Sequence, residues 1–164
     1  NKGLSFLQFV IVFGLFSIIA SLVIVVTNPL QKIQSADDTI RKNDIKNLQK
    51  MLEEYYRDRT RYPSSKDYKI VDFKTNLPIA WGNAWIPYMN FLPKDPNSSR
   101  NYVYYSTNNN QTYYLYAALE DISDPERCLS AGPGICESIQ ANNIPPNACG
   151  ARCDFGVSSP NTSP

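Results

Sequence analysis

KGLSFLQFVIVFGLFSIIASLVIVV, residues 2–26, begins with a basic residue and then runs almost without polar side chains. At about 1.5 Å per residue, a helix from Leu4 to Val26 is roughly 35 Å long, enough to cross a hydrocarbon core of about 30 Å. A secretory signal peptide has a shorter apolar stretch with small residues at its cleavage site, whereas Val-Val-Thr-Asn-Pro follows here. Lys2 precedes the stretch, so the positive-inside rule places the N-terminus in the cytoplasm. Residues 4–28 are therefore predicted to form a transmembrane helix.

The remaining residues, 29–164, have the composition of one exported domain. The net charge is +1, so no global field would attract nucleic acid or anionic lipid. Three Asn-x-Ser/Thr sequons are candidate glycosylation sites: Asn97, Asn110 and Asn161.

The four cysteines all lie near the C-terminus: Cys128, Cys136, Cys149 and Cys153. Their spacing, C-x7-C-x12-C-x3-C, lacks the C-x2-C knuckles of structural zinc sites, and an oxidising compartment favours disulfides over zinc. We predict two disulfides and no metal or cofactor. Of the three connectivities, the sequential one, 128 with 136 and 149 with 153, closes the shortest loops.

After Pro29 the apolar residues recur at three-, four- and five-residue steps, which predicts an amphipathic helix. Its apolar side is predicted to hold Ile33, Ala36, Ile40, Ile45, Leu48, Leu52 and Tyr55. Its polar side is predicted to hold Asp37, Asp38, Arg41, Lys42, Lys46, Lys50, Glu53 and Glu54. The helix should end near Thr60, because Pro63 disfavours helical geometry at the preceding residue.

Two stretches rich in aromatic and β-branched residues, 101–106 and 112–118, flank a polar turn and predict a β-hairpin. A further strand is predicted at 68–73, and residues 64–100 read as a wrapped loop with one short helix. Beyond Pro125 the chain reads as irregular. The expected fold class is α+β, with a long N-terminal helix packed on a small antiparallel β-sheet and a disulfide-bonded irregular C-terminal segment.

Four features in this order resemble the type IV pilins and the type II secretion pseudopilins of the short major kind. They are Lys2-Gly3 followed by Leu-Ser-Phe-Leu-Gln, the apolar run, the stretch from Arg41-Lys-Asn-Asp44 to Tyr62-Pro63, and Leu92-Pro-Lys-Asp-Pro96 before the tyrosine-rich hairpin. The resemblance covers roughly residues 2–118.

The resemblance implies that residues 1–3 are leader-like and that a prepilin peptidase would recognise Lys2, Gly3 and Leu4. It implies a homopolymer whose filament core is the helix 4–28, with Leu4, Gln8, Gly14 and Pro29 as candidate assembly residues. An inner-membrane platform protein and an assembly ATPase would drive extraction from a single-pass membrane pool into an extracellular pilus. The β-branched run before Pro29 is predicted to break the helix within Leu22–Asn28 in the assembled state. The alternative is a proline kink within a continuous helix.

Two departures from the family pattern bear on these expectations. Gln8 stands where the family has a glutamate that pairs with the freed N-terminal amine, and an amide cannot neutralise that amine. Either the charge is met in another way, or the chain is not cut and begins at Asn1. The aspartate-rich calcium loop of the pseudopilins is also missing. Glu120, Asp121, Asp124 and Glu126 cluster around Pro125 without a glycine, which favours a solvated acidic turn over a calcium site.

Three functions follow: a major pilin for adhesion, twitching motility or DNA uptake, a minor tip pilin that contacts a receptor through residues 128–153, or a secretion pseudopilin. An enzyme is not expected, because histidine is absent and no Ser or Cys lies in a nucleophile motif. The hairpin tyrosines could stack on DNA bases, but the sheet needs alternate ones for its core, so no direct nucleic-acid surface is predicted.

Overall fold

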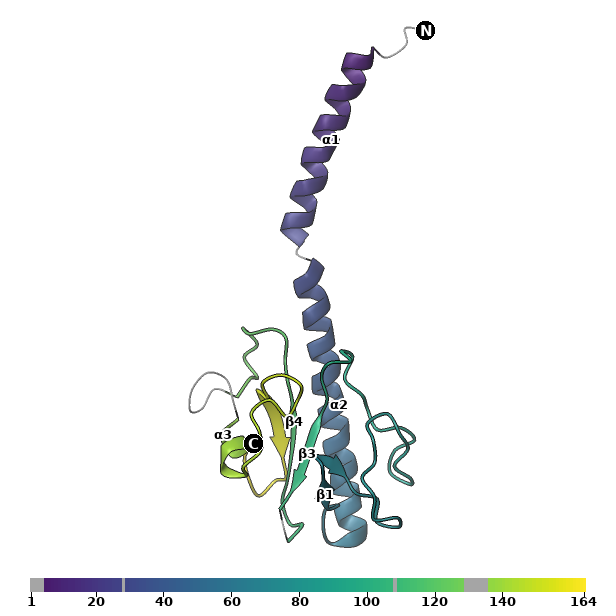
Figure 1. Cartoon of the computed structure of the whole chain (residues 1–164), viewed down its shortest axis with the longest axis vertical. Helices are drawn as coiled ribbons and strands as arrows, with labels where there is room; N and C mark the ends of the chain where they lie inside the picture. The colour runs from purple at the N-terminus through teal and green to yellow at the C-terminus, as the bar shows by residue number, and fades with distance from the viewer. Residues whose placement is uncertain (1–4, 28, 108, 129–135) are drawn as a thin grey trace.

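A long helical stalk leads into a head that is built around a small β-sheet (Figure 1). The computed structural model describes residues 5–27, 29–107, 109–128 and 136–164, with the backbone alone at residues 22 and 24–27. Helix α1 (Phe6–Thr27) extends away from the head, and α2 (Pro29–Arg59) runs from the stalk into it. The predicted helix end near Thr60 is confirmed. The predicted break stays a prediction for the assembled state, because α1 is helical to Thr27 and residue 28 lies outside the described residues.

The head contains a three-stranded antiparallel sheet in the order β3-β4-β5. Its strands are β3 (Val103–Ser106), β4 (Tyr113–Ala117) and β5 (Phe155–Ser158). The first two form the predicted hairpin, with Tyr105 opposite Tyr114. Strand β5, which pairs Val157 with Leu115, was not predicted. It is a short stretch that contains a glycine, so it carries little strand signal of its own and depends on β4 as a template.

The long loop before the hairpin holds less regular structure than predicted. Only β1 (Ser65–Lys66) and β2 (Lys69–Ile70) form a ladder, so the strand predicted at 68–73 shrinks to two residues and one bridge from Val71 to Pro78. Residues 64–100, all of them described, contain no helix, so the short helix predicted there was wrong. The loop packs instead through Trp85 and Leu92, which lie in the main core.

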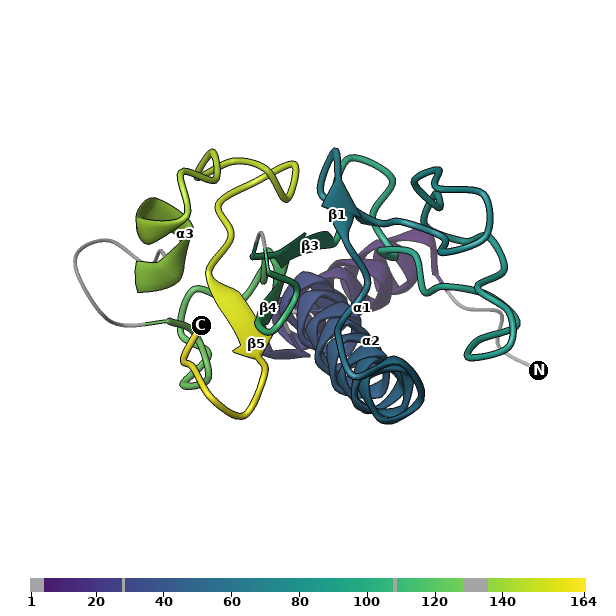
Figure 2. The ribbon, with the colours of Figure 1, turned by 90° about the horizontal axis from the view of Figure 1, so that it is seen from below.

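Both faces of the sheet are covered, which explains why β4 is buried along its whole length. Tyr113 and Leu115 pack against α2, whereas Tyr114 and Tyr116 pack under the C-terminal segment that contains α3 (Glu137–Ala141). Figure 2 shows α2 and the C-terminal segment on different sides of β4. Two disulfides, Cys128–Cys136 and Cys149–Cys153, close loops within the C-terminal region. They confirm the predicted sequential connectivity.

The buried side of α2 differs from the predicted one. It consists of Asp38, Arg41, Ile45, Leu48, Leu52 and Tyr55, so two charged residues predicted on the polar side are buried. Ile33 and Ile40 are instead 59% and 46% exposed. The five-residue step from Ile40 to Ile45 turns the helix by about 140°, so the apolar residues above it face a different direction from those below. The upper apolar stripe therefore does not contribute to the core of this chain.

Candidate assembly surface

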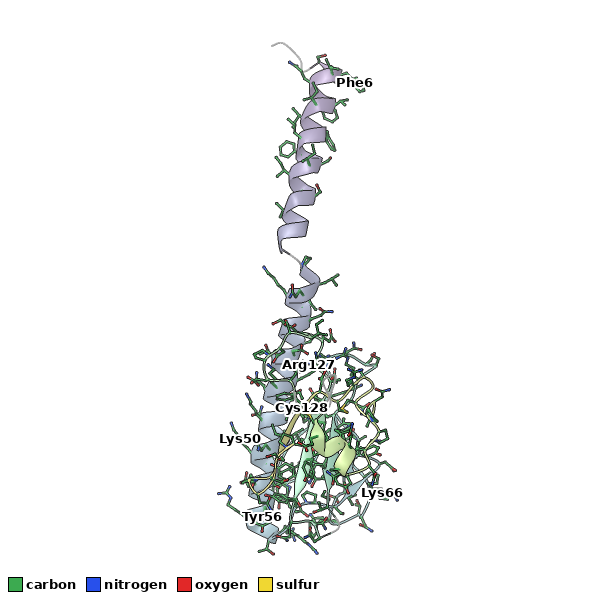
Figure 3. All side chains as sticks on the ribbon, turned by 90° about the vertical axis from the view of Figure 1, so that its left-hand side faces the viewer. Phe6, Lys50, Tyr56, Lys66, Arg127 and Cys128 are labelled. Carbon is green, nitrogen blue, oxygen red and sulfur yellow. A yellow bond between two sulfur atoms is a disulfide. The ribbon has the colours of Figure 1, made fainter. Side chains whose placement is uncertain are left out.

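Helix α1 presents an apolar surface that no other described part of the chain covers. Its sequence contains no charged residue, and its large apolar side chains are about half exposed or more, from Val12 at 46% to Phe6 at 82%. Figure 3 shows these side chains projecting from a bare helix, with Phe6 near its far end. The hydroxyl groups of Ser17 and Ser21 donate hydrogen bonds to backbone carbonyl groups of their own helix, so they need no polar partner outside it. A contiguous run of exposed apolar side chains of this kind marks a protein–protein or membrane interaction surface.

The membrane span predicted from the sequence stays a prediction. Within the described residues, no helix has the length and apolarity required to cross a membrane.

The candidate assembly residues occupy different environments. The Gln8 side chain accepts a hydrogen bond from the Ser5 backbone N–H at 3.1 Å, which closes the first turn of α1. Gly14 lies on the uncovered surface, with no neighbouring atom within 4 Å of where a Cβ would be. Pro29 is the first residue of α2, where its missing N–H costs no helical hydrogen bond. Their role in assembly stays a prediction. Lys2, Gly3 and Leu4, the predicted peptidase site, lie outside the described residues.

A buried charged cluster fixes α2 to the rest of the head. The Arg41 guanidinium group, which is fully buried, donates through Nε and Nη2 to both carboxylate oxygens of Asp95, at 2.9 Å each. It also donates to Asp38 at 2.7 Å and to Glu120 at 3.0 Å. We call these four residues the charged clasp. They bring together α2, the loop before β3 and the loop after β4.

The second function of the clasp is to hold a turn at the edge of the head. The Asp38 carboxylate accepts hydrogen bonds from the backbone N–H groups of Glu120 and Asp121, at 2.8 to 3.0 Å. Burial lowers the pKa of Arg41, but its hydrogen bonds to Asp95 and Asp38 outweigh that effect, so its pKa lies above the usual value. Arg41 therefore stays charged, and the clasp positions the segment 120–127, which we call the Ile122 turn.

Sequence reasoning missed the clasp because it assigned charged residues of α2 to solvent. A signal was nevertheless present. Arg41 and Asp95 lie in two of the stretches that carry the family resemblance, Arg41-Lys-Asn-Asp44 and Leu92-Pro-Lys-Asp-Pro96. The structure brings these stretches together through the bidentate Arg41–Asp95 pair. Two distant motifs that contain opposite charges are candidates for such a pair.

The acidic residues of the Ile122 turn have protein partners. Asp124 pairs with Lys42 at 2.5 Å, and Glu126 lies 3.8 Å from Lys42. Glu120 belongs to the clasp and is only 13% exposed at its side chain, so the turn is less solvated than the sequence suggested. In the part of the chain that the structure describes, no cluster of Asp, Glu or Cys is arranged to hold a metal ion.

The three sequons differ in accessibility. Asn97 is half-buried beside the clasp, where its side-chain oxygen accepts hydrogen bonds from the backbone and hydroxyl of Ser99. Asn110 is also half-buried and accepts from Ser106. Asn161 is exposed near the C-terminus. Glycosylation stays a prediction at all three, with Asn161 presenting the most accessible amide.

Asp44, one turn below Arg41 on α2, gives the head a predicted pH dependence. Burial raises the pKa of Asp44 more than the 2.7 Å hydrogen bond from Tyr102 lowers it. The folded state therefore holds a proton more tightly than the unfolded state, so stability falls as pH rises from the usual pKa of 3.8 through the raised one. We expect Asp44→Asn, which can still accept from Tyr102, to be more stable than wild type at pH 7.

Urea unfolding of the full chain in detergent at pH 4 and pH 7 tests this expectation. The difference in unfolding free energy between the two pH values should become smaller in Asp44→Asn. A variant less stable than wild type at pH 7 would contradict the assignment of a burial penalty to Asp44.

Comparison with known proteins identifies a family for the head and its helix. A family model described as type II secretion system (T2SS), protein G matches residues 28–124. The match includes α2, strands β1 to β4 and all four residues of the charged clasp. Neither a curated protein nor a solved structure matches the chain.

Proposed function

Because the chain belongs to the protein G family of type II secretion systems, we propose that it is the repeating structural subunit of an extracellular helical filament. The observation that supports this proposal is α1, a charge-free helix whose apolar side chains are uncovered. Each large apolar side chain left in water costs roughly 1.5 to 3 kcal/mol. Only lipid or other protein chains can cover so many of them. A central bundle of α1 helices from successive copies would do so.

The membrane would act as a reservoir in this scheme. Lipid and an α1 bundle are similarly apolar, so hydrophobicity alone does not drive a subunit from one to the other. Close packing at small residues would favour the bundle, and Gly14, with open space around it, offers one such position. An assembly ATPase acting through a membrane platform protein is the proposed source of work, and a prepilin peptidase the proposed processing enzyme.

Within the family, we propose that the chain is the major subunit of its filament. The filament would serve adhesion, twitching motility or DNA uptake. The C-terminal segment supports it, because Cys136, Cys149 and Cys153 are fully buried against the sheet. That segment therefore builds the core of the head, whereas a receptor-binding tip subunit would be expected to expose it. The secretion pseudopilin is the second candidate, favoured by the description of the matching family model. In all these roles we propose a structural subunit and not an enzyme.

Immunoelectron microscopy of filaments sheared from cells tests the proposal. Antibodies raised against residues 64–164 should label the filaments along their whole length. Labelling confined to the ends would assign the chain to the tip subunits. Loss of exported proteins on deletion of the gene, without any labelled surface filament, would favour the pseudopilin.

A further inference from the structure

An apolar groove lies on one flank of α2. It has a volume of about 440 Å³ and lies between the helix and the loop 88–91. Its lining residues are Asn47, Lys50, Met51, Tyr88, Met89, Asn90 and Phe91. Phe91 is 73% exposed, and Lys50 projects from the outer side of α2 (Figure 3). No carboxylate within the described residues pairs with Lys50. We call this site the Phe91 groove.

The Ile122 turn presents an apolar side chain on a hydrogen-bonded support. Ile122 is 84% exposed, and its carbonyl accepts a hydrogen bond from Arg127 at 2.9 Å. The preceding residue, Asp121, is fixed through its backbone N–H to Asp38, and its Oδ1 accepts from the backbone N–H of Ser123 at 2.9 Å. A large apolar side chain held in water by this many contacts is suited to insertion into a partner.

The groove and the turn lie on opposite flanks of α2. The turn is attached beside Lys42 and Lys46, and the groove is lined by Met51. Met51 lies five residues after Lys46, about 140° further round the helix. Lys50, four residues after Lys46, lies about 40° from it, so it stands on the outer face of α2 between the turn and the rest of the groove. Figures 1 and 2 both show the loop 120–127 and the loop 81–96 on different sides of the helix. Two complementary surfaces on opposite flanks of one chain give a head-to-tail contact, which generates a helical array when repeated.

The flank that carries the groove also carries two exposed apolar residues nearer the N-terminus of α2. Ile33, Ile40, Asn47 and Met51 follow one another at steps of seven, seven and four residues, so they lie along one line of the helix. Ile33 and Ile40 are exposed in the single chain. These two side chains lie on the same flank as the groove, so a neighbouring copy that docked there would also cover them.

We propose that the Ile122 turn of one copy docks in the Phe91 groove of the next copy, with Asp121 beside Lys50. The charges are complementary, because the acidic turn meets a lysine that has no acidic partner within its own described chain. The inference rests on the proposed filament, in which α1 bundling holds successive copies parallel. The turn is attached near residue 40 and the groove lies near residue 49, so docked copies are staggered by roughly 14 Å along the helix.

Site-directed photo-crosslinking in the full chain tests this contact in cells. A photoreactive phenylalanine analogue replaces Ile122, and the matched control carries it at Leu77, another exposed apolar residue, 61% accessible. Membranes and sheared filaments are irradiated, and crosslinked peptides are identified by mass spectrometry. The probe at position 122 should join peptides containing Met51 or Phe91 of a second copy, and the probe at position 77 should not.

Two further variants test the charge pairing. Asp121→Asn keeps an oxygen that can accept from Ser123 but removes the charge, and Lys50→Gln removes the opposite charge. Each should lower the crosslink yield about twofold to fivefold, as expected for an exposed ion pair. The double variant should show no further loss, because both changes remove one interaction. Independent losses that multiply would contradict the pairing.

The outcomes separate this contact from the proposed function. Filaments in which the position 122 probe reaches other residues, or none, would overturn the contact and leave the filament proposal standing. Groove crosslinks in membranes of cells that form no filament would support the contact and overturn the filament. Absence of both filaments and groove crosslinks would overturn both.

Discussion

Arg41→Ala is expected to lower the free energy of unfolding of the head by about 3 to 5 kcal/mol. The substitution leaves the carboxylates of Asp38, Asp95 and Glu120 close together without the cation that they surround. Removing one partner of a buried ion pair has a cost in this range, because the remaining charge is left uncompensated. Urea unfolding of the full chain in detergent, followed by the fluorescence of the buried Trp85, measures the change.

Arg57→Ala is the matched control for this experiment. Arg57 lies in the last turn of the same helix and is exposed, so its loss should change stability by no more than about 0.5 kcal/mol. If Arg41→Ala had as small an effect as Arg57→Ala, the clasp would not be a structural element of the head.

Because Asp38 also holds the Ile122 turn, Arg41→Ala should reduce the crosslink from position 122 in chains that remain folded.

The sequence predicted those parts of the fold that depend on local pattern. The apolar period of α2 below Ile45 was sufficient to place the helix on the sheet, and Pro63 was sufficient to place its end. The hairpin was predicted because its strands are rich in tyrosine and β-branched residues and are separated by a short polar turn. Each of these signals lies within a window of a few residues, and tertiary contacts did not override it.

The parts that were missed depend on contacts between distant segments. Arg41 is buried only because Asp95 and Glu120, 54 and 79 residues away, supply its partners. Its charge alone indicates an exposed position, which is where most arginines lie. Strand β5 likewise exists because β4 offers an edge, and the long buried run of β4 was the one signal that both of its faces are covered. The candidate assembly helix was predicted from its composition, but the surfaces of the head that would meet a second copy became visible only in the structure.

Phe16→Lys is expected to lower the amount of assembled chain by on the order of 100-fold. Phe16 lies near the middle of α1, is 67% exposed in the single chain and belongs to neither core cluster of the head. In the proposed bundle its neighbours are apolar side chains of other α1 helices, which offer no partner to an ammonium group. An unpaired lysine at the centre of an apolar span costs about 2.5 to 3.5 kcal/mol, which corresponds to this factor. In the membrane pool the side chain can relieve this cost by snorkelling towards the headgroups, whereas in the bundle it is enclosed, so the penalty falls on the assembled state. Quantitative immunoblotting of sheared filaments against the cell-associated pool measures it.

Phe16→Leu distinguishes the effect of charge from the loss of the aromatic ring. Leucine keeps an apolar side chain and a high helix propensity, so this variant should assemble at close to the wild-type level. Both variants should unfold at the wild-type urea concentration, because no described side chain of α1 belongs to the core of the head. Wild-type amounts of Phe16→Lys filament would mean that α1 is not enclosed by other copies. Contacts between the heads would then have to hold the filament together.

In that case the docking of the Ile122 turn in the Phe91 groove would supply the main assembly interface. Lys50→Gln would then reduce the filament yield more than Phe16→Lys does.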